Sequence, residues 1–169
     1  MEYFIQQLIN GISVGSIYAL IALGYTMVYG IIKLINFAHG DVFMVGSFIG
    51  LFTAKYLAGA GLPPVLVLII SLVFSMLVSA LLGITIERLA YKPLRKSTRI
   101  AALITAIGVS FFLEYVGVLI LGPQAQGFPD ILEKNQYKLF GTSIQVDSNQ
   151  IMILLTTIIL MMILQYIVH

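Results

Sequence analysis

The amino-acid sequence predicts an all-α, polytopic membrane protein with about five transmembrane helices. Apolar residues make up 60% of the chain, charged residues only 9%, and the mean hydropathy is +1.04. An ordinary soluble domain carries about 25% charged residues. Five segments are apolar over lengths near the roughly 20 residues that a membrane span requires. A chain so poor in charge cannot cover a water-exposed surface, so the lipid bilayer is its predicted solvent.

The predicted spans alternate with more polar connections and cover residues 4–29, 42–57, 65–86, 100–121 and 151–168. The first span has no charged residue between Glu2 and Lys33. At about 1.5 Å per residue the span 4–29 is near 40 Å long. It exceeds a hydrocarbon core of ~30 Å, so it must tilt, kink or break, for example near Gly24 or Gly30. Because it lacks the basic start of a secretory signal, we expect it to remain as a span.

We treat residues 1–169 as a single transmembrane domain with one strongly basic connection at residues 87–99. This connection holds five of the nine Lys and Arg residues, namely Arg88, Lys92, Arg95, Lys96 and Arg99. The positive-inside rule therefore predicts that it is cytoplasmic. The N-terminus would then lie outside the plasma (inner) membrane and the C-terminus inside. Lys33 agrees with this orientation, and Lys55 weighs slightly against it, although its side chain could snorkel. The connection carries no aromatic stripe, so no nucleic-acid partner is predicted.

Residues 122–150 form the predicted external segment. Residues 137–146 could fold into a small hairpin around Gly141 and Thr142, because short β-prone runs flank a turn-forming glycine. Asp147, Ser148 or Asn149 could cap the fifth helix.

Small residues recur every four positions along the first four spans, and such stripes let helix backbones approach closely. The residues that we assign to helix packing are Gly11, Gly15, Gly46, Gly50, Ser75, Ser79 and Gly83. The stripes also include Ala19, Ala54, Ser71, Ala102, Ala106 and Ser110. Packing within this chain is the favoured interpretation. A face that lines a path or meets another subunit is the alternative.

Polar side chains between and within the spans are the candidates for a translocation path, because polar groups at membrane depth are costly. Asn36 and His39 lie in the polar stretch between the first two spans, and Glu114 is the only acidic residue inside a span. Each has a structural alternative, since His39 could hydrogen-bond a helix end and Glu114 could snorkel. In the same stretch Asp41 could cap the second helix, with Gly40 allowing the turn.

The sequence lacks the motifs of several common enzyme classes. There is no GxxxxGK[ST] phosphate loop, no HExxH motif and no GxSxG nucleophile elbow. The chain has no cysteine, and its two histidines are 130 positions apart. We therefore predict a protein that is not an enzyme and holds no metal or cofactor.

Four stretches carry a resemblance to a known family. They are GSIYALIALGYTMVYG at residues 15–30, INFAHGD at 35–41, IERLAYKPLR at 86–95 and ALITAIG at 102–108. Together they resemble the branched-chain amino acid ABC transporter permeases of the LivH type. The similarity covers nearly the whole chain and is weakest in residues 122–150.

The resemblance implies a set of partners and a mode of action. Such permeases pair with a second, related permease, two cytoplasmic ATPase subunits drive the pair, and an external solute-binding protein delivers leucine, isoleucine or valine. Family members continue after the fifth span with a coupling segment and further spans. The chain is therefore expected to match the N-terminal part of an incomplete permease fold. Related urea permeases have a similar polar stretch, so urea or another small amide or amino acid remains an alternative substrate.

Two other functions stay open from the residues alone. An ion-coupled secondary transporter or channel would need no ATPase, and Glu114 would then be its coupling site. A membrane scaffold that transports nothing would show no substrate-dependent signal in any assembly.

Overall fold

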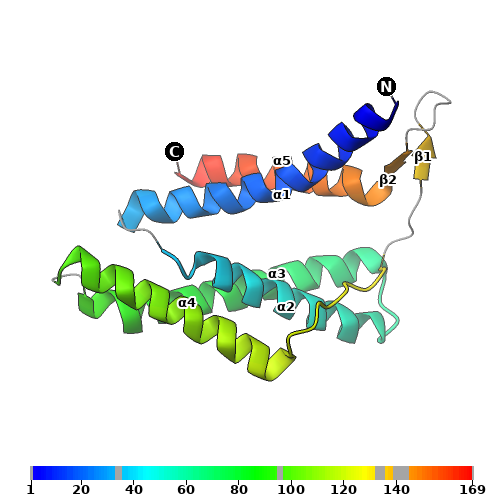
Figure 1. Cartoon of the computed structure of the whole chain (residues 1–169). Coiled ribbons are helices and arrows are strands. Elements are labelled where there is room, and N and C mark those ends of the chain that lie inside the picture. The colour runs from blue at the N-terminus through cyan, green and yellow to red at the C-terminus, as the bar shows by residue number, and fades with distance from the viewer. Residues whose placement is uncertain (1, 33–35, 95–96, 132–135, 139–144, 169) are drawn as a thin grey trace. The chain divides into compact units, whose positions relative to one another are not determined.

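The computed structural model describes residues 2–32, 36–94, 97–131, 136–138 and 145–168. Its α-helices are α1 (Glu2–Ile32), α2 (His39–Ala58), α3 (Pro64–Ile86), α4 (Arg99–Leu121) and α5 (Ser148–Val168) (Figure 1). All five are long and apolar enough to cross a membrane. The predicted all-α class with five spans is thereby confirmed.

The first helix runs unbroken through Gly24 and Gly30. Its 31 residues correspond to a length of about 46 Å. The sequence predicts that this span tilts, kinks or breaks to fit a bilayer. The prediction of a break is wrong, because the helix is continuous.

The start of α2 differs from the prediction. The helix begins at His39, its N-cap position is Ala38, and no side chain caps it. Asp41 lies inside the first turn, where a negative charge suits the positive end of the helix dipole. The expectation that Asp41 caps this helix is wrong, because the chain already turns into the helix three residues earlier.

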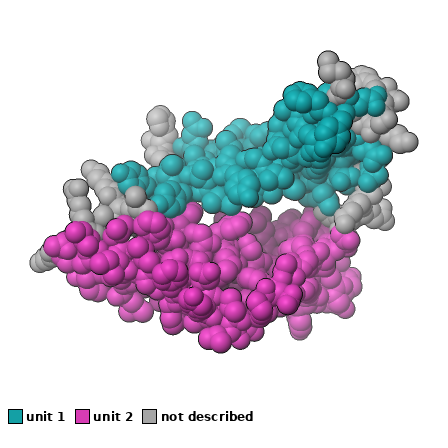
Figure 2. Space-filling view, in the orientation of Figure 1, with its two compact units in different colours: residues 1–32, 132–169 teal, residues 33–131 magenta. Residues whose placement is uncertain are grey.

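The chain divides into two compact units, coloured teal and magenta in Figure 2. Unit 1 comprises Met1–Ile32 and Leu132–His169. In this unit α1 and α5 lie side by side and run in the same direction (Figure 1). Ser13 of α1 and Thr157 of α5 are buried.

A small antiparallel sheet precedes α5 in unit 1. Strand β1 (Gln136–Lys138) pairs with β2 (Gln145–Asp147), with Tyr137 opposite Val146. The pairing is that of the predicted hairpin, whereas the predicted turn at Gly141 and Thr142 lies outside the described residues. At the start of α5 the Asp147 backbone N–H donates to Gln150 Oε1 at 3.2 Å. This contact is one half of a capping box, in which the side chain of Gln150, and not that of Asp147, is the acceptor.

Unit 2 comprises Lys33–Ile131 and contains α2, α3 and α4. The core of this unit lies along the seam between α2 and α3, where Leu51, Ala54, Val67 and Ser71 are buried. The Ser75 hydroxyl donates to the Gly46 carbonyl at 2.6 Å across this seam. After Ile86 the chain continues through a π-helical turn, η1 (Glu87–Tyr91), and a short 3-10 turn, η2 (Lys92–Leu94). This irregular segment sets the position of Tyr91.

Candidate functional site

Asn36 is the first described residue of the polar connection before α2, and its side chain accepts two hydrogen bonds. The Ala38 backbone N–H donates to Asn36 Oδ1 at 3.1 Å, and the Tyr91 phenol donates to the same oxygen at 2.6 Å. The His39 backbone N–H donates to the Asn36 carbonyl at 3.2 Å. Asn36 therefore shapes the turn into α2 and ties it to the end of η1.

Asp41, in the first turn of α2, makes a second long-range contact. The Ser110 hydroxyl of α4 donates to Asp41 Oδ2, and both side chains are half-buried. Ser110 lies eleven residues after the start of α4 at Arg99, a rise of about 16 Å along the helix. The first turn of α2 thus lies level with the middle of α4. Within the described residues, the partner of this carboxylate is a hydroxyl group rather than a cation.

The structure brings Asn36 and His39 together but leaves Glu114 apart from them. His39 is half-buried as the first residue of α2. Glu114 is exposed on α4, one turn after Ser110. It has no hydrogen bond or ion pair within the part of the chain that the structure describes.

The residues assigned to helix packing fall into two groups. Gly46, Gly50, Ser75 and Ser79 meet along the seam between α2 and α3. A β-carbon on Gly46 would collide with Ser79 Oγ, whereas one on Gly50 would lie at an ordinary 3.7 Å from Ser75 Cβ. Around Gly11, Gly15 and Gly83 an added β-carbon would find nothing within 4 Å.

The structure describes only some of the basic residues from which the membrane topology is predicted. Arg88 lies in η1 and Lys92 in η2, and both are exposed. Arg99 is the first residue of α4. Arg95 and Lys96 lie outside the described residues.

Two hydrogen bonds in unit 2 each join helix ends that should lie on the same side of a membrane. The bond between Asn36 and Tyr91 joins the start of α2 to the end of α3. Lys55, near the end of α2, donates at 3.4 Å to Gln126, which follows α4. Each bond joins two ends that fall on the same side when successive helices cross in opposite directions. This grouping does not depend on which side is external.

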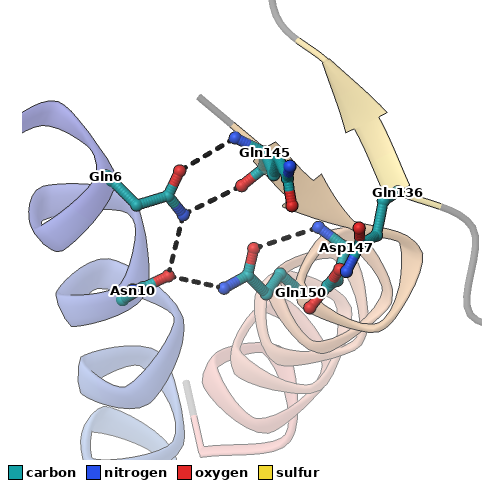
Figure 3. Close-up of a pocket in the computed structure, with 6 residues that line it drawn as sticks. All are labelled: Gln6, Asn10, Gln136, Gln145, Asp147 and Gln150. Carbon is teal, nitrogen blue, oxygen red and sulfur yellow. Dashed lines mark hydrogen bonds between the residues drawn. The ribbon is translucent and has the colours of Figure 1, made fainter. Parts of the chain in front are cut away.

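A second polar site lies in unit 1, where α1 and α5 begin. It is an open pocket of about 430 Å³ lined by Gln6, Asn10, Gln136, Gln145, Asp147 and Gln150 (Figure 3). The lining side chains described are five amides and one carboxylate. They come from both helices and both strands.

Three of these amide side chains hold one another in place (Figure 3). Gln6 Nε2 donates to the Gln145 carbonyl at 2.9 Å, and the Gln145 backbone N–H donates back to Gln6 Oε1 at 2.8 Å. Asn10 Oδ1 accepts from Gln6 Nε2 at 3.3 Å and from Gln150 Nε2 at 2.9 Å. Gln6, Asn10 and Gln150 thus fasten strand β2 and the start of α5 to α1. We call this set the amide clasp.

The sequence interpretation missed this pocket, although one signal pointed to it. Gln6 and Asn10 are four residues apart, and Ser13 follows three residues later. These positions share one face of a helix. A polar face on an otherwise apolar first span indicates a polar partner, which the structure supplies from β2 and α5.

One family profile matches residues 7–169, and its description is branched-chain amino acid transport system / permease component. The chain belongs to this family. The predicted resemblance is therefore confirmed. The family description is that of a transport component, which agrees with the prediction of a permease rather than an enzyme.

Two relatives in this permease family illustrate the match. The chain is 43% identical over 164 residues to the high-affinity branched-chain amino acid transport system permease protein BraD of Pseudomonas aeruginosa, covering 94% of this chain and 53% of the relative. It is 45% identical over 130 residues to the corresponding permease protein LivH of Escherichia coli K12, covering 76% and 42%. The chain thus spans about half the length of the curated relatives it matches. No solved structure matches the chain.

Proposed function

We propose that the chain forms part of the permease subunit of an ABC importer that carries leucine, isoleucine and valine into the cell. Membership of the permease family supports the transport role, and the relatives named for high-affinity branched-chain amino acid transport support this substrate class. Five helices with the length and composition of membrane spans support a multi-pass location in the inner membrane.

The observation that carries the proposal is the hydrogen-bonded polar connection of unit 2. Asn36 bonds to Tyr91, and Asp41 in the first turn of α2 bonds to Ser110, so the entry into α2 is attached to both η1 and α4. Polar groups placed between membrane spans mark pathways and pairing sites. In this proposal Asn36 and His39 shape the inner mouth of the path, and Glu114 belongs to the path at a separate point on α4.

The proposed orientation follows from the charges. The basic connection at residues 87–99 faces the cytoplasm, where exposed Arg88 and Lys92 remain hydrated. The N-terminus and residues 122–150 are then external, and the C-terminus is internal.

The proposed partners are a second related permease, two cytoplasmic ATPase subunits and an external solute-binding protein. Hydrolysis of ATP on a partner fits a chain without a phosphate loop. The open space beside Gly11 and Gly15 on α1 would allow close approach of a helix from outside the described residues.

The test is uptake of labelled leucine, isoleucine and valine by cells that express the complete permease with its partners. Asn36→Leu and His39→Leu should each lower uptake at least tenfold at normal expression, on the order of the loss of one half-buried polar anchor. Asn149→Leu, at the start of α5, is the matched control and should leave uptake near the wild-type level. Normal uptake by both path variants would overturn their assignment. An excess of urea that abolishes leucine uptake would favour the amide substrate instead.

A further inference from the structure

The amide pocket at the start of α1 and α5 is held in shape before any ligand arrives. Gln6, Asn10 and Gln150 are fixed by bonds to one another and to the backbone of β2. These bonds order the frame of the pocket, so the frame itself loses little conformational entropy when a ligand binds. The pocket volume of about 430 Å³ also lies within the range of roughly 300–1,000 Å³ that small-molecule sites occupy.

The clasp leaves specific polar groups of the pocket unused. Gln6 Nε2 makes two hydrogen bonds, and Asn10 Oδ1 accepts two. Within the described residues, no hydrogen bond engages Asn10 Nδ2, the Asp147 carboxylate, or the side-chain amides of Gln136 and Gln145. One negative charge and several amide N–H donors therefore remain available in the same pocket.

We propose that this pocket binds the ammonium and carboxylate groups of a free α-amino acid. Asp147 receives the ammonium group, because charge-assisted hydrogen bonds are the stronger ones. The amide N–H groups of Asn10, Gln136 and Gln145 donate to the ligand carboxylate. The inference rests on the proposed function, which makes an amino acid the transported solute.

The lining residues predict that the side chain of the ligand contributes little to binding. The described lining residues are all polar, so they offer no aliphatic wall for a branched side chain. In this proposal the described side chains contact the ammonium and carboxylate groups that all α-amino acids share. In the proposed orientation it opens on the outer side, so it acts as a first contact for the incoming solute, distinct from the polar connection before α2.

The experiment measures direct binding by calorimetry to the complete permease assembly in lipid nanodiscs, without the solute-binding protein. Leucine should bind, and Asp147→Asn should weaken binding about tenfold, as expected for loss of a hydrogen bond to a charged group. Glu2→Gln is the matched control, because it removes one negative charge from the first turn of α1 without changing a residue that lines the pocket. It should bind leucine as the wild type does.

Ligand variants test the chemistry. Leucinamide, which lacks the carboxylate, and 4-methylpentanoate, which lacks the ammonium group, should each bind at least several-fold more weakly than leucine. Glycine should bind with an affinity within about threefold of that of leucine.

A phospholipid headgroup that carries an ammonium group could also occupy the pocket, so nanodiscs with and without phosphatidylethanolamine are compared. Equal leucine affinity in both supports the proposal, and loss of leucine binding in phosphatidylethanolamine overturns it.

A second variant shows whether weaker binding results from loss of a pocket side chain or from misfolding. Gln136→Leu changes a side chain on the other strand and should also weaken leucine binding several-fold while the melting temperature stays unchanged. Wild-type affinity in both Asp147→Asn and Gln136→Leu, or no leucine binding by the wild-type assembly, would overturn the proposal. Uptake by the complete transporter distinguishes failure of the pocket proposal from failure of the proposed function. Uptake without direct binding refutes only the pocket, whereas absence of branched-chain uptake refutes the proposed function.

Discussion

The Tyr91 phenol donates a 2.6 Å hydrogen bond to Asn36 Oδ1, although the two residues are 55 positions apart. The same oxygen accepts the Ala38 backbone N–H. One amide oxygen therefore holds both the turn into α2 and the irregular end of α3. Motion of η1 relative to α2 must break or carry this bond.

Replacing Tyr91 with Phe tests this link. The substitution removes one hydrogen bond and keeps the ring, so we expect a loss of about 1 kcal/mol in stability and a several-fold fall in leucine uptake. Tyr56→Phe, on an exposed residue of α2, should change neither quantity. In a double-mutant cycle with Asn36→Ala the two effects should be non-additive, because the residues share one bond. Additive effects would show that the bond is not the relevant interaction.

Ser110→Ala should destabilise unit 2 because it takes away the hydroxyl that donates to Asp41. A half-buried carboxylate that loses its donor is expected to cost about 1–3 kcal/mol. Ser47→Ala is a suitable comparison, since the Ser47 hydroxyl donates only within its own helix, to the Phe43 carbonyl. Thermal unfolding in detergent measures both. Equal melting temperatures for the two variants would contradict the assigned contact.

Gly46→Ala and Gly50→Ala should have opposite effects on the seam between α2 and α3. A β-carbon at position 46 collides with Ser79 Oγ, so overpacking should destabilise the protein by about 1–3 kcal/mol. At position 50 the nearest atom is at 3.7 Å, and replacing a helical glycine should stabilise by about 0.5–1 kcal/mol. Melting temperatures that fall equally for both variants would refute the close approach at Gly46.

Gln6→Ala should loosen strand β2, because the Gln145 backbone N–H donates to Gln6 Oε1. Hydrogen exchange followed by mass spectrometry should show faster exchange at the Gln145 amide, by about tenfold or more for the loss of its acceptor. Exchange in the middle of α3 should stay the same. Unchanged protection at Gln145 would mean that the clasp does not hold this strand.

Glu114→Gln separates an ATP-driven importer from an ion-coupled carrier. If ATP on partner subunits drives uptake, this variant should retain at least about half of the wild-type rate, and collapse of ion gradients should leave uptake in place. Energy from a gradient would instead require a chargeable coupling group in the membrane. Loss of uptake in Glu114→Gln, together with uptake in ATP-depleted vesicles, would establish the carrier.

Local patterns were sufficient to predict the helices but not their partners. Apolar run lengths placed all five spans to within a few residues, since each span must cover the same hydrocarbon thickness. The strand pairing around Tyr137 and Val146 also followed from local pattern. The predicted start of α2 is three residues late, because the polar residues His39 and Asp41 indicate a connection, whereas helical hydrogen bonding includes them.

The cross-helix contacts could not be predicted, because each depends on residues far apart in the chain. In the sequence, Ser110 stands out only as part of a small-residue stripe, and Asp41 only as a candidate cap. Tyr91 is a single aromatic residue in a basic segment, and nothing local distinguishes it. Which side chains meet is decided by helix rotation and depth, and neither quantity is fixed by the apolar pattern of a single span.

The clasp also constrains how the chain is made. Asn10 bonds to Gln150, which is synthesised 140 positions later. At a translation rate of roughly 5–20 residues per second this interval is about 7–28 s. Throughout it, Gln6 and Asn10 of a newly inserted first helix need water, lipid headgroups or a translocon to satisfy their amides. Biogenesis of this protein should therefore depend on how long the first helix is sheltered before the fifth arrives.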